Sequence, residues 1–181
     1  MPTTTVKPDG TVTVETGEHA AKSTWDGGTI ATRVIKAEAE RRYTLCVIYP
    51  ADKADVAVAL DGHRDFASKA VVEDAAWNYM RNYRQVGVAH SPEHAASMGV
   101  AFKASDAADV VESYIYRGPD WLIKASDGSE VMIKAGDWLG GFIWSPETWA
   151  DIQAGKVNGM SAEGGAIRRT PSPDAIANLR N

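Results

Sequence analysis

The sequence contains little cysteine, no long apolar run and fewer basic than acidic residues. Cys46 is the only cysteine among 181 residues, so no disulfide can form within the chain. It lies in the apolar segment YTLCVIY, which predicts a buried thiol and fits a reducing, intracellular setting. No stretch of about 18 apolar residues occurs, and the initial MPTTTVKPDG lacks the features of a signal peptide. We therefore expect neither a membrane span nor export by that route.

The charge balance argues against nucleic acid as a partner. The chain has 19 Lys and Arg against 24 Asp and Glu, which gives a net charge of −5. Binding to a phosphate backbone depends on basic side chains that displace counterions, and this chain has no basic excess. With 44% hydrophobic residues, the chain is long enough for one globular domain with a substantial core.

Three regions are expected along the chain. Residues 1–28 are rich in Thr and Gly and predict an extended N-terminal arm, with TVTVE as a short strand. Residues 29–170 carry the periodic apolar patterns of a folded domain. Residues 171–181 are polar and begin with a proline, so we expect a tail that runs over the surface.

The domain is expected to be α+β and mainly β, a bent antiparallel sheet or barrel with a few flanking helices. Apolar residues at three- and four-residue steps predict a helix over residues 69–84, with Ser68 near its start as a cap. SPETWADIQAG predicts a second, shorter helix capped by Ser145. Strands are predicted over residues 42–49, 86–89, 98–104, 109–116, 120–125, 130–135 and 137–144.

Large aromatic residues fall within these predicted strands and helices. Such residues most often fill the core, so a binding platform is the less favoured interpretation. We expect four tryptophans to be buried: Trp121, Trp138, Trp144 and Trp149.

Two histidines four residues apart raise the question of a metal site. His90, Glu93 and His94 match H-x-x-E-H, in which two histidines on one helix face bind zinc and the glutamate activates a water molecule. The strand-like VGVA runs straight into His90 and Pro92 lies within the motif, so a regular helix there is strained. No third ligand stands out downstream, and we predict neither a metal nor a cofactor. Two histidines on a loop, or one histidine as a catalytic base, are the other interpretations.

Ser161 in NGMSAEGGA is a candidate nucleophile. It follows the second predicted helix in a stretch of small residues, where we expect an accessible hydroxyl and backbone N–H groups that can face a developing oxyanion. A serine among glycines is also common as a turn residue, and that alternative stays open on this feature alone.

Together, these segments resemble the XkdF-like phage serine proteases, relatives of the prohead (head-maturation) proteases that share the herpesvirus assemblin fold. The resemblance covers about residues 43–170. It rests on YTLCVIYP, DGHRDFASKAVVEDAAWNYM, the histidine-ending strand VGVAH, VVESYI and WLGGFIWSPETWADIQAGKVNGMSAEGGA. The last segment is the most specific, because it joins a strand, a helix that begins near Pro-Glu-x-Trp, a Gly-Lys turn and G-[FM]-S followed by glycines.

The resemblance implies a catalytic serine and histidine. Ser161 is the nucleophile and His90 its general base, since a neutral imidazole that titrates near working pH can accept the hydroxyl proton. Glu112 in VVESYI is the preferred third member, which would orient the imidazole; a solvent-facing strand residue is the alternative. His94 and His63 are lesser candidates.

Gly164, Gly165 and Arg168 are expected to support the oxyanion. The two glycines permit a close approach of the backbone, or equally a bend in a barrel strand. The role of Arg168 follows from the resemblance, in which arginines near the serine help to hold the oxyanion; an exposed arginine is the alternative. Glu163 departs from the family pattern, which has an apolar residue followed by glycine after the serine.

The activity implied is that of a serine endopeptidase that cleaves phage scaffold or capsid proteins during head assembly. Its expected partners are the phage scaffold and major capsid proteins, and a homo-oligomer is compatible with assemblin-like activation. The expected location is the host cytoplasm, within or associated with proheads or the virion. The alternative is a non-catalytic virion protein that retains the protease-like fold and binds the capsid through its N-terminal arm.

Overall fold

The computed structural model of the protein describes a short N-terminal segment and most of the chain from Val34 onward. The predicted strand TVTVE, Ser161, Gly164 and Gly165 lie outside the described residues. The described residues are 2–6, 34–54, 64–125, 128–157, 159–160, 162, 167–168, 171–177 and 179.

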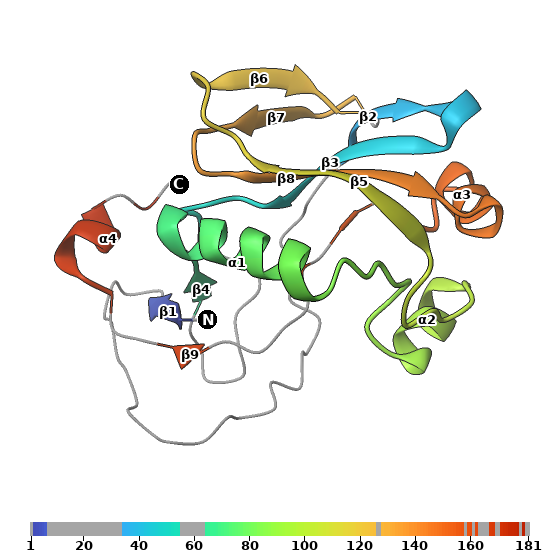
Figure 1. The fold of residues 1–181 in the computed structure, drawn as a ribbon, viewed down its shortest axis with the longest axis horizontal. Coiled ribbons are helices and arrows are strands. Elements are labelled where there is room, and N and C mark those ends of the chain that lie inside the picture. The colour runs from blue at the N-terminus through green and yellow to red at the C-terminus, as the bar shows by residue number, and fades with distance from the viewer. Residues whose placement is uncertain are drawn as a thin grey trace.

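A four-stranded antiparallel sheet lies at the centre of the fold (Figure 1). Its four strands, in spatial order, are β2 (Val34–Glu38), β3 (Tyr43–Tyr49), β8 (Trp138–Trp144) and β5 (Ala108–Ile115). The predicted strands over residues 42–49, 109–116 and 137–144 are therefore confirmed as β3, β5 and β8. A short 3-10 helix, η1 (Ala39–Arg41), joins β2 to β3.

A hairpin covers one face of this sheet. It consists of β6 (Trp121–Lys124) and β7 (Glu130–Ile133), which confirm two further predicted strands. Ile133 of the hairpin packs with Leu139 of β8 and Val47 of β3 in a small buried cluster. This second, smaller core exists because apolar residues of β8 alternate between the two faces of the sheet.

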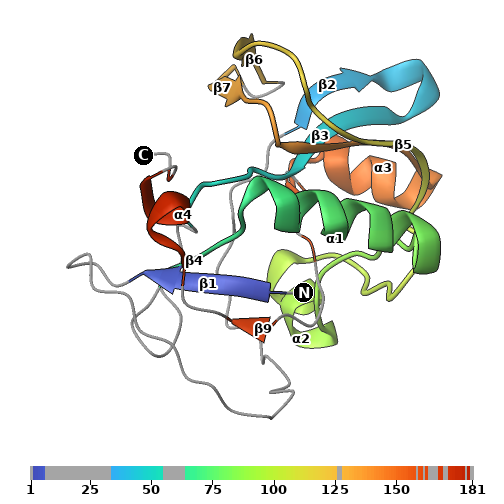
Figure 2. The same cartoon turned by 60° about the vertical axis from the view of Figure 1, so that its left-hand side comes forward.

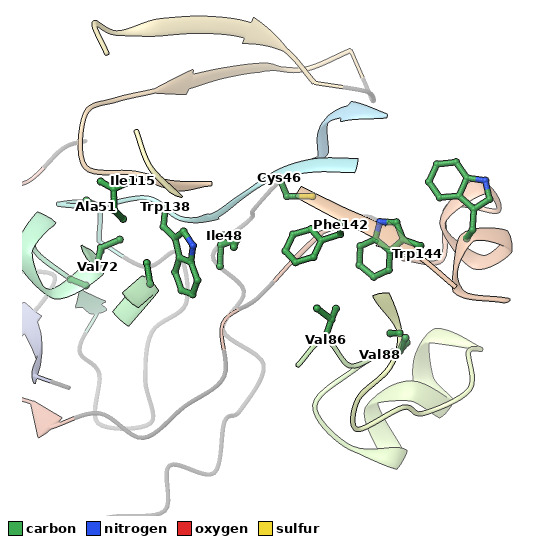
Figure 3. Close-up of a cluster of buried hydrophobic side chains, with 14 residues drawn as sticks. Cys46, Ile48, Ala51, Val72, Val86, Val88, Ile115, Trp138, Phe142 and Trp144 are labelled. Atoms are coloured by element: carbon green, nitrogen blue, oxygen red, sulfur yellow. The ribbon is translucent and has the colours of Figure 1, made fainter. Parts of the chain in front are cut away.

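Helix α1 (Lys69–Asn82) covers the other face and confirms the predicted helix. Ser68 is at its N-cap position, but the serine side chain makes no capping hydrogen bond. Val72 and Ala76 of α1 are buried in the main core with side chains of β3 and β8 (Figure 3). The core residues contributed by β3 and β8 are Cys46, Ile48, Trp138, Phe142 and Trp144.

A second sheet of three short strands lies on the far side of α1, so this helix is held between the two sheets (Figures 1 and 2). The central strand β1 (Pro2–Val6) pairs antiparallel with β4 (Arg64–Phe66) and parallel with β9 (Ile167–Arg168). The chain then forms α4 (Pro173–Ala177) within the region expected to be a surface tail. Residues close to the two ends of the chain thus meet in one sheet.

Two of the predicted strands are not formed. The segment 98–104 was expected to be extended, but Met98 is the last residue of α2 (Pro92–Met98). Gly99 follows with φ 67°, a left-handed conformation that ends the helix. Within residues 86–89 there is only an isolated bridge, between Val88 and Lys103.

The α+β, mainly β class is confirmed, with open sheets in the described part of the chain rather than a closed barrel. The second predicted helix is also confirmed as α3 (Pro146–Gln153), where Ser145 Oγ accepts a hydrogen bond from the Thr148 N–H over 3.3 Å. Three of the four tryptophans are buried as expected. Trp121 is the exception: it is the first residue of β6, at one end of the hairpin, and is 43% exposed.

Candidate active site

The chain before His90 is held against residues 103–107. The Val88 N–H donates to the Lys103 carbonyl over 2.8 Å, and the Ala107 N–H donates to the Val86 carbonyl over 2.9 Å. At Gly87 the two segments come so close that a Cβ atom would lie 2.5 Å from the Lys103 carbonyl oxygen. Glycine is required there because any larger residue would push the paired segments apart.

Val86 and Val88 fix this segment to the main core. Both valines are 5% exposed and pack with Phe142 and Trp144 (Figure 3). Ala89 then turns the chain with a positive φ of 63°. Only Ala89 separates the buried Val88 from His90, and the left-handed conformation of Ala89 sets the direction in which the chain continues to His90.

Helix α2 begins after His90 and carries His94. The Ser91 side chain caps this helix by accepting a hydrogen bond from the His94 N–H over 3.1 Å. The two imidazole rings stack with centroids 5.9 Å apart and an angle of 11° between planes. In addition, the His90 N–H donates to Nδ1 of His94 over 3.5 Å. Hydrogen bonds from its own backbone N–H and from Ser91 lower the pKa of Glu93.

The helical zinc motif is not formed by these residues. Pro92 is the first residue of α2, so His90 precedes the helix and the two histidines do not lie one turn apart on a single helix. Within the described part of the chain, no group of three or more His, Cys, Asp or Glu residues could hold a metal ion.

The neighbours of Ser161 pack against the same core as the histidine segment. Met160 and Ala162 are partly buried and contact the cluster that contains Val86 and Val88. Trp149 of α3, the helix that precedes the serine segment, belongs to this cluster too. The roles of Ser161, Gly164 and Gly165 stay predictions, because these residues lie outside the described ones.

Arg168 and Glu112 lie in strands. Arg168 is the last residue of β9, where its backbone pairs with Thr3 of β1. Glu112 is in β5, and its carboxylate accepts a hydrogen bond from the Tyr43 hydroxyl of β3 over 2.8 Å. Both functional assignments stay predictions.

The Tyr43–Glu112 pair occupies the face of the sheet that is opposite to the main core. The missing side chain of Gly141 leaves the space for it, since a Cβ there would lie 2.7 Å from Glu112 Oε2. Its neighbour Gly140 faces Ile48 and the main core instead, and successive residues of a strand point to opposite faces. Glu112 therefore lies on the other face from the valines that anchor the His90 segment. Sequence reasoning missed Tyr43 as its partner, because no local pattern reports a contact across 69 positions.

An open pocket of about 200 Å³ lies beside the histidine segment. One wall is formed by residues 84–86, which lead toward His90, and the other by Asp106 and residues 108–110 at the start of β5. Arg84 and Asp106 both have positive φ angles, 53° and 63°. Non-glycine residues in this conformation are uncommon and are enriched at functional sites.

A comparison with protein families shows which proteins this chain is related to. Residues 31–169 match the family described as "Putative phage serine protease XkdF". The chain belongs to this family. The resemblance inferred from the sequence is thereby confirmed, and the match to the XkdF family includes both His90 and Ser161.

A curated relative is similar to most of this chain, and its name defines no activity. The chain is 28% identical over 135 residues to "Uncharacterized protein YqbD" of Bacillus subtilis (strain 168). The aligned part is 74% of this chain and 35% of that protein, so the chain spans about a third of the relative's length. No solved structure matches the chain. Among the described helices, none is long and apolar enough to cross a membrane.

Proposed function

We propose that this member of the XkdF family is a serine endopeptidase that cleaves phage scaffold or capsid proteins during head assembly. The observation that carries the proposal is the shared core: residues on either side of Ser161 pack against the cluster that anchors the His90 segment. Met160 and Ala162, which flank Ser161, therefore share one core with Val86 and Val88, which precede His90. A serine nucleophile requires this, because its base must lie within hydrogen-bonding reach.

The proposed reaction uses the serine as nucleophile and the histidine as proton carrier. Ser161 Oγ attacks the carbonyl carbon of the scissile peptide bond while His90 accepts the hydroxyl proton. His90 then gives this proton to the leaving amine, and a water molecule hydrolyses the acyl-enzyme by the same route. Backbone N–H groups near Gly164 and Gly165, with help from Arg168, would stabilise the oxyanion.

Labelling with a fluorophosphonate tests the activated serine directly. We expect one covalent adduct on the purified chain by intact mass spectrometry, absent from Ser161→Ala and strongly reduced in His90→Ala. A matched control is Ser97→Ala, which removes a serine of α2 whose hydroxyl donates to the His94 carbonyl. The adduct should persist in this variant, because Ser97 has no part in the proposed chemistry.

The same experiment separates the protease from a structural virion protein. If no adduct forms on the wild-type chain, alone or in assembled proheads, the proposal of an active serine is wrong. Stoichiometric presence of the chain in mature particles would then identify it as a virion component. Cleavage of a cognate scaffold protein that continues undiminished in Ser161→Ala would also contradict the proposal.

A further inference from the structure

The outer edge of β5 is long and carries neither lysine nor proline. β5 has eight residues, whereas the other outer strand of the sheet, β2, has five. Among the described strands β5 pairs only with β8, so its second edge presents backbone N–H and C=O groups to an added strand. Proteins commonly block such edges with proline, lysine or a β-bulge. ADVVESYI contains neither proline nor lysine, and its one register shift with β8 lies between Val110 and Glu112.

The backbone pattern shows which groups of β5 face outward. Immediately after the strand, the Tyr116 N–H and carbonyl bond to Asp137 and Gly136, on the side of β8. Because these directions alternate along an antiparallel strand, the backbone groups of Ser113 and Ile115 point to the free edge. The Arg117 guanidinium donates to the Ile115 carbonyl over 3.3 Å, as expected for an outward-facing group.

The free edge begins where the pocket opens. Just before β5, the Ala107 N–H is bonded to Val86, so the chain beside it acts as a neighbouring strand at that point. The two segments then diverge, and the pocket of about 200 Å³ separates residues 84–86 from residues 108–110. An extended peptide placed on β5 would continue the sheet from this pocket and set one side chain into it.

The charges beside the β5 edge indicate which kind of peptide binds there. Asp106 and Asp109 line the pocket against one cation, Arg84. The other nearby guanidinium, Arg117, is paired with Glu73 of α1. A second copy of this chain, paired antiparallel on β5, would bring acidic side chains close to acidic side chains. A basic peptide is complementary instead.

We propose that the β5 edge binds an extended segment of the substrate polypeptide as an added strand, with a Lys or Arg side chain in the pocket beside Asp109. The identity of this ligand as the substrate rests on the proposed protease function. Val86 and His90 are four residues apart, a span of at most about 14 Å. A strand on β5 therefore needs only a few residues to reach the histidine.

Peptide binding to the Ser161→Ala chain tests this site without turnover. The probes are three fluorescein-labelled peptides of alternating valine and threonine: one with a central lysine, one with a central glutamate, and the lysine peptide with alternate backbone nitrogens methylated. We expect the lysine peptide to bind about tenfold more tightly than the glutamate peptide in fluorescence anisotropy. N-methylation should remove binding, because it blocks the backbone hydrogen bonds of an added strand.

Charge variants of the protein connect this preference to the pocket. Asp109→Lys should abolish the preference for lysine, and Asp109→Asn should reduce it if the lysine variant does not fold. Asp174→Lys, an equal charge change on exposed α4, is the matched control and should leave the preference intact. Equal affinity for the lysine and glutamate peptides, binding that survives N-methylation, or no binding by any probe would each overturn the β5 site.

Failure of this site is distinguishable from failure of the protease proposal. Lysine-peptide binding without a fluorophosphonate adduct would keep the β5 site and remove the enzyme. An adduct at Ser161 without peptide binding would do the reverse.

Discussion

The Tyr43 hydroxyl donates a hydrogen bond to Glu112 over 2.8 Å, although β8 lies between their strands. The two side chains meet above Gly141, whose missing Cβ leaves room for both the carboxylate and the tyrosine ring. Burial, followed by the interaction with Glu112, raises the pKa of Tyr43. This contact holds the outer strand β5 to β3, two strands away.

We predict that Tyr43→Phe lowers the free energy of unfolding by about 1 kcal/mol, the usual contribution of one hydrogen bond. Glu112→Gln should cost a similar amount, and the double variant should cost less than the sum of the two. Urea unfolding at neutral pH measures all three. Additive effects would show that the two residues are not coupled.

The variant Glu112→Gln also tests the predicted catalytic role of Glu112. A third catalytic residue that orients His90 would lower the rate of fluorophosphonate labelling by orders of magnitude. From its contact with Tyr43, we expect the effect to appear in stability and the labelling rate to change by less than about tenfold. A loss of labelling in a folded Glu112→Gln protein would instead establish the catalytic role.

The N-cap of α2 gives a prediction with a matched control in the same chain. Ser91→Ala should lower stability by about 1 kcal/mol, because the His94 N–H loses its acceptor. Ser68→Ala should cost less than about 0.5 kcal/mol, since Ser68 is at the N-cap of α1 but its side chain makes no capping bond. Urea unfolding and hydrogen exchange of the α2 amides report both effects. Equal losses would contradict the assignment of Ser91 as the cap.

Two tryptophans allow the stability contribution of a buried aromatic side chain to be compared with that of an exposed one. Trp144 is 3% exposed, and its Nε1–H donates to Thr44 Oγ1 over 2.8 Å. Trp144→Phe should therefore cost about 2 kcal/mol or more, from the lost volume and the lost hydrogen bond to the buried Thr44 hydroxyl. Trp121→Phe on the exposed end of the hairpin should cost less than about 0.5 kcal/mol. A comparison of their thermal or urea midpoints checks the order.

Stability should fall in alkaline solution. Burial raises the pKa of Cys46 to about 11 and that of Tyr79 to about 12. Both groups hold their protons more firmly when folded, so their stabilisation is fully present below the unfolded pKa values and is lost as pH rises above about 9. The slope for one such group is about 1.4 kcal/mol per pH unit.

Urea unfolding under reducing conditions, between about pH 8 and about pH 10.5, measures this fall. Cys46→Ala should begin less stable, because it leaves a small cavity, but should lose stability more slowly with pH. An unchanged slope in Cys46→Ala would show that the thiol does not contribute.

Local sequence patterns were sufficient to predict the helices and strands whose apolar residues recur at one regular spacing. The spacing of apolar residues predicted α1, and the Ser-Pro-Glu start predicted α3 with its Ser145 cap. Alternating and β-branched residues predicted β3, β5 and β8. The segment 98–104 failed because GVAF resembles a strand, whereas the Ser91 cap and Gly99 mark the ends of a helix that contains Met98.

The family and the residue types of the candidate site could likewise be inferred from the order of motifs along the chain. His90 and Ser161 both lie in the part that matches the XkdF family. Their catalytic roles stay predictions, which rest on the motifs and on the chemistry of an imidazole base and a serine hydroxyl.

Only the tertiary structure decided which residues far apart in the sequence pack together or line the same pocket. The packing of Met160 and Ala162 against the core of Val86 and Val88, the pairing of Tyr43 with Glu112, and the pocket beside β5 all join segments far apart in the chain. Local preferences depend on neighbours a few positions away, whereas these contacts arise from strand order and from glycines that allow close approach. The sequence therefore determined the chemical groups and most of the elements, and the fold determined which of them meet.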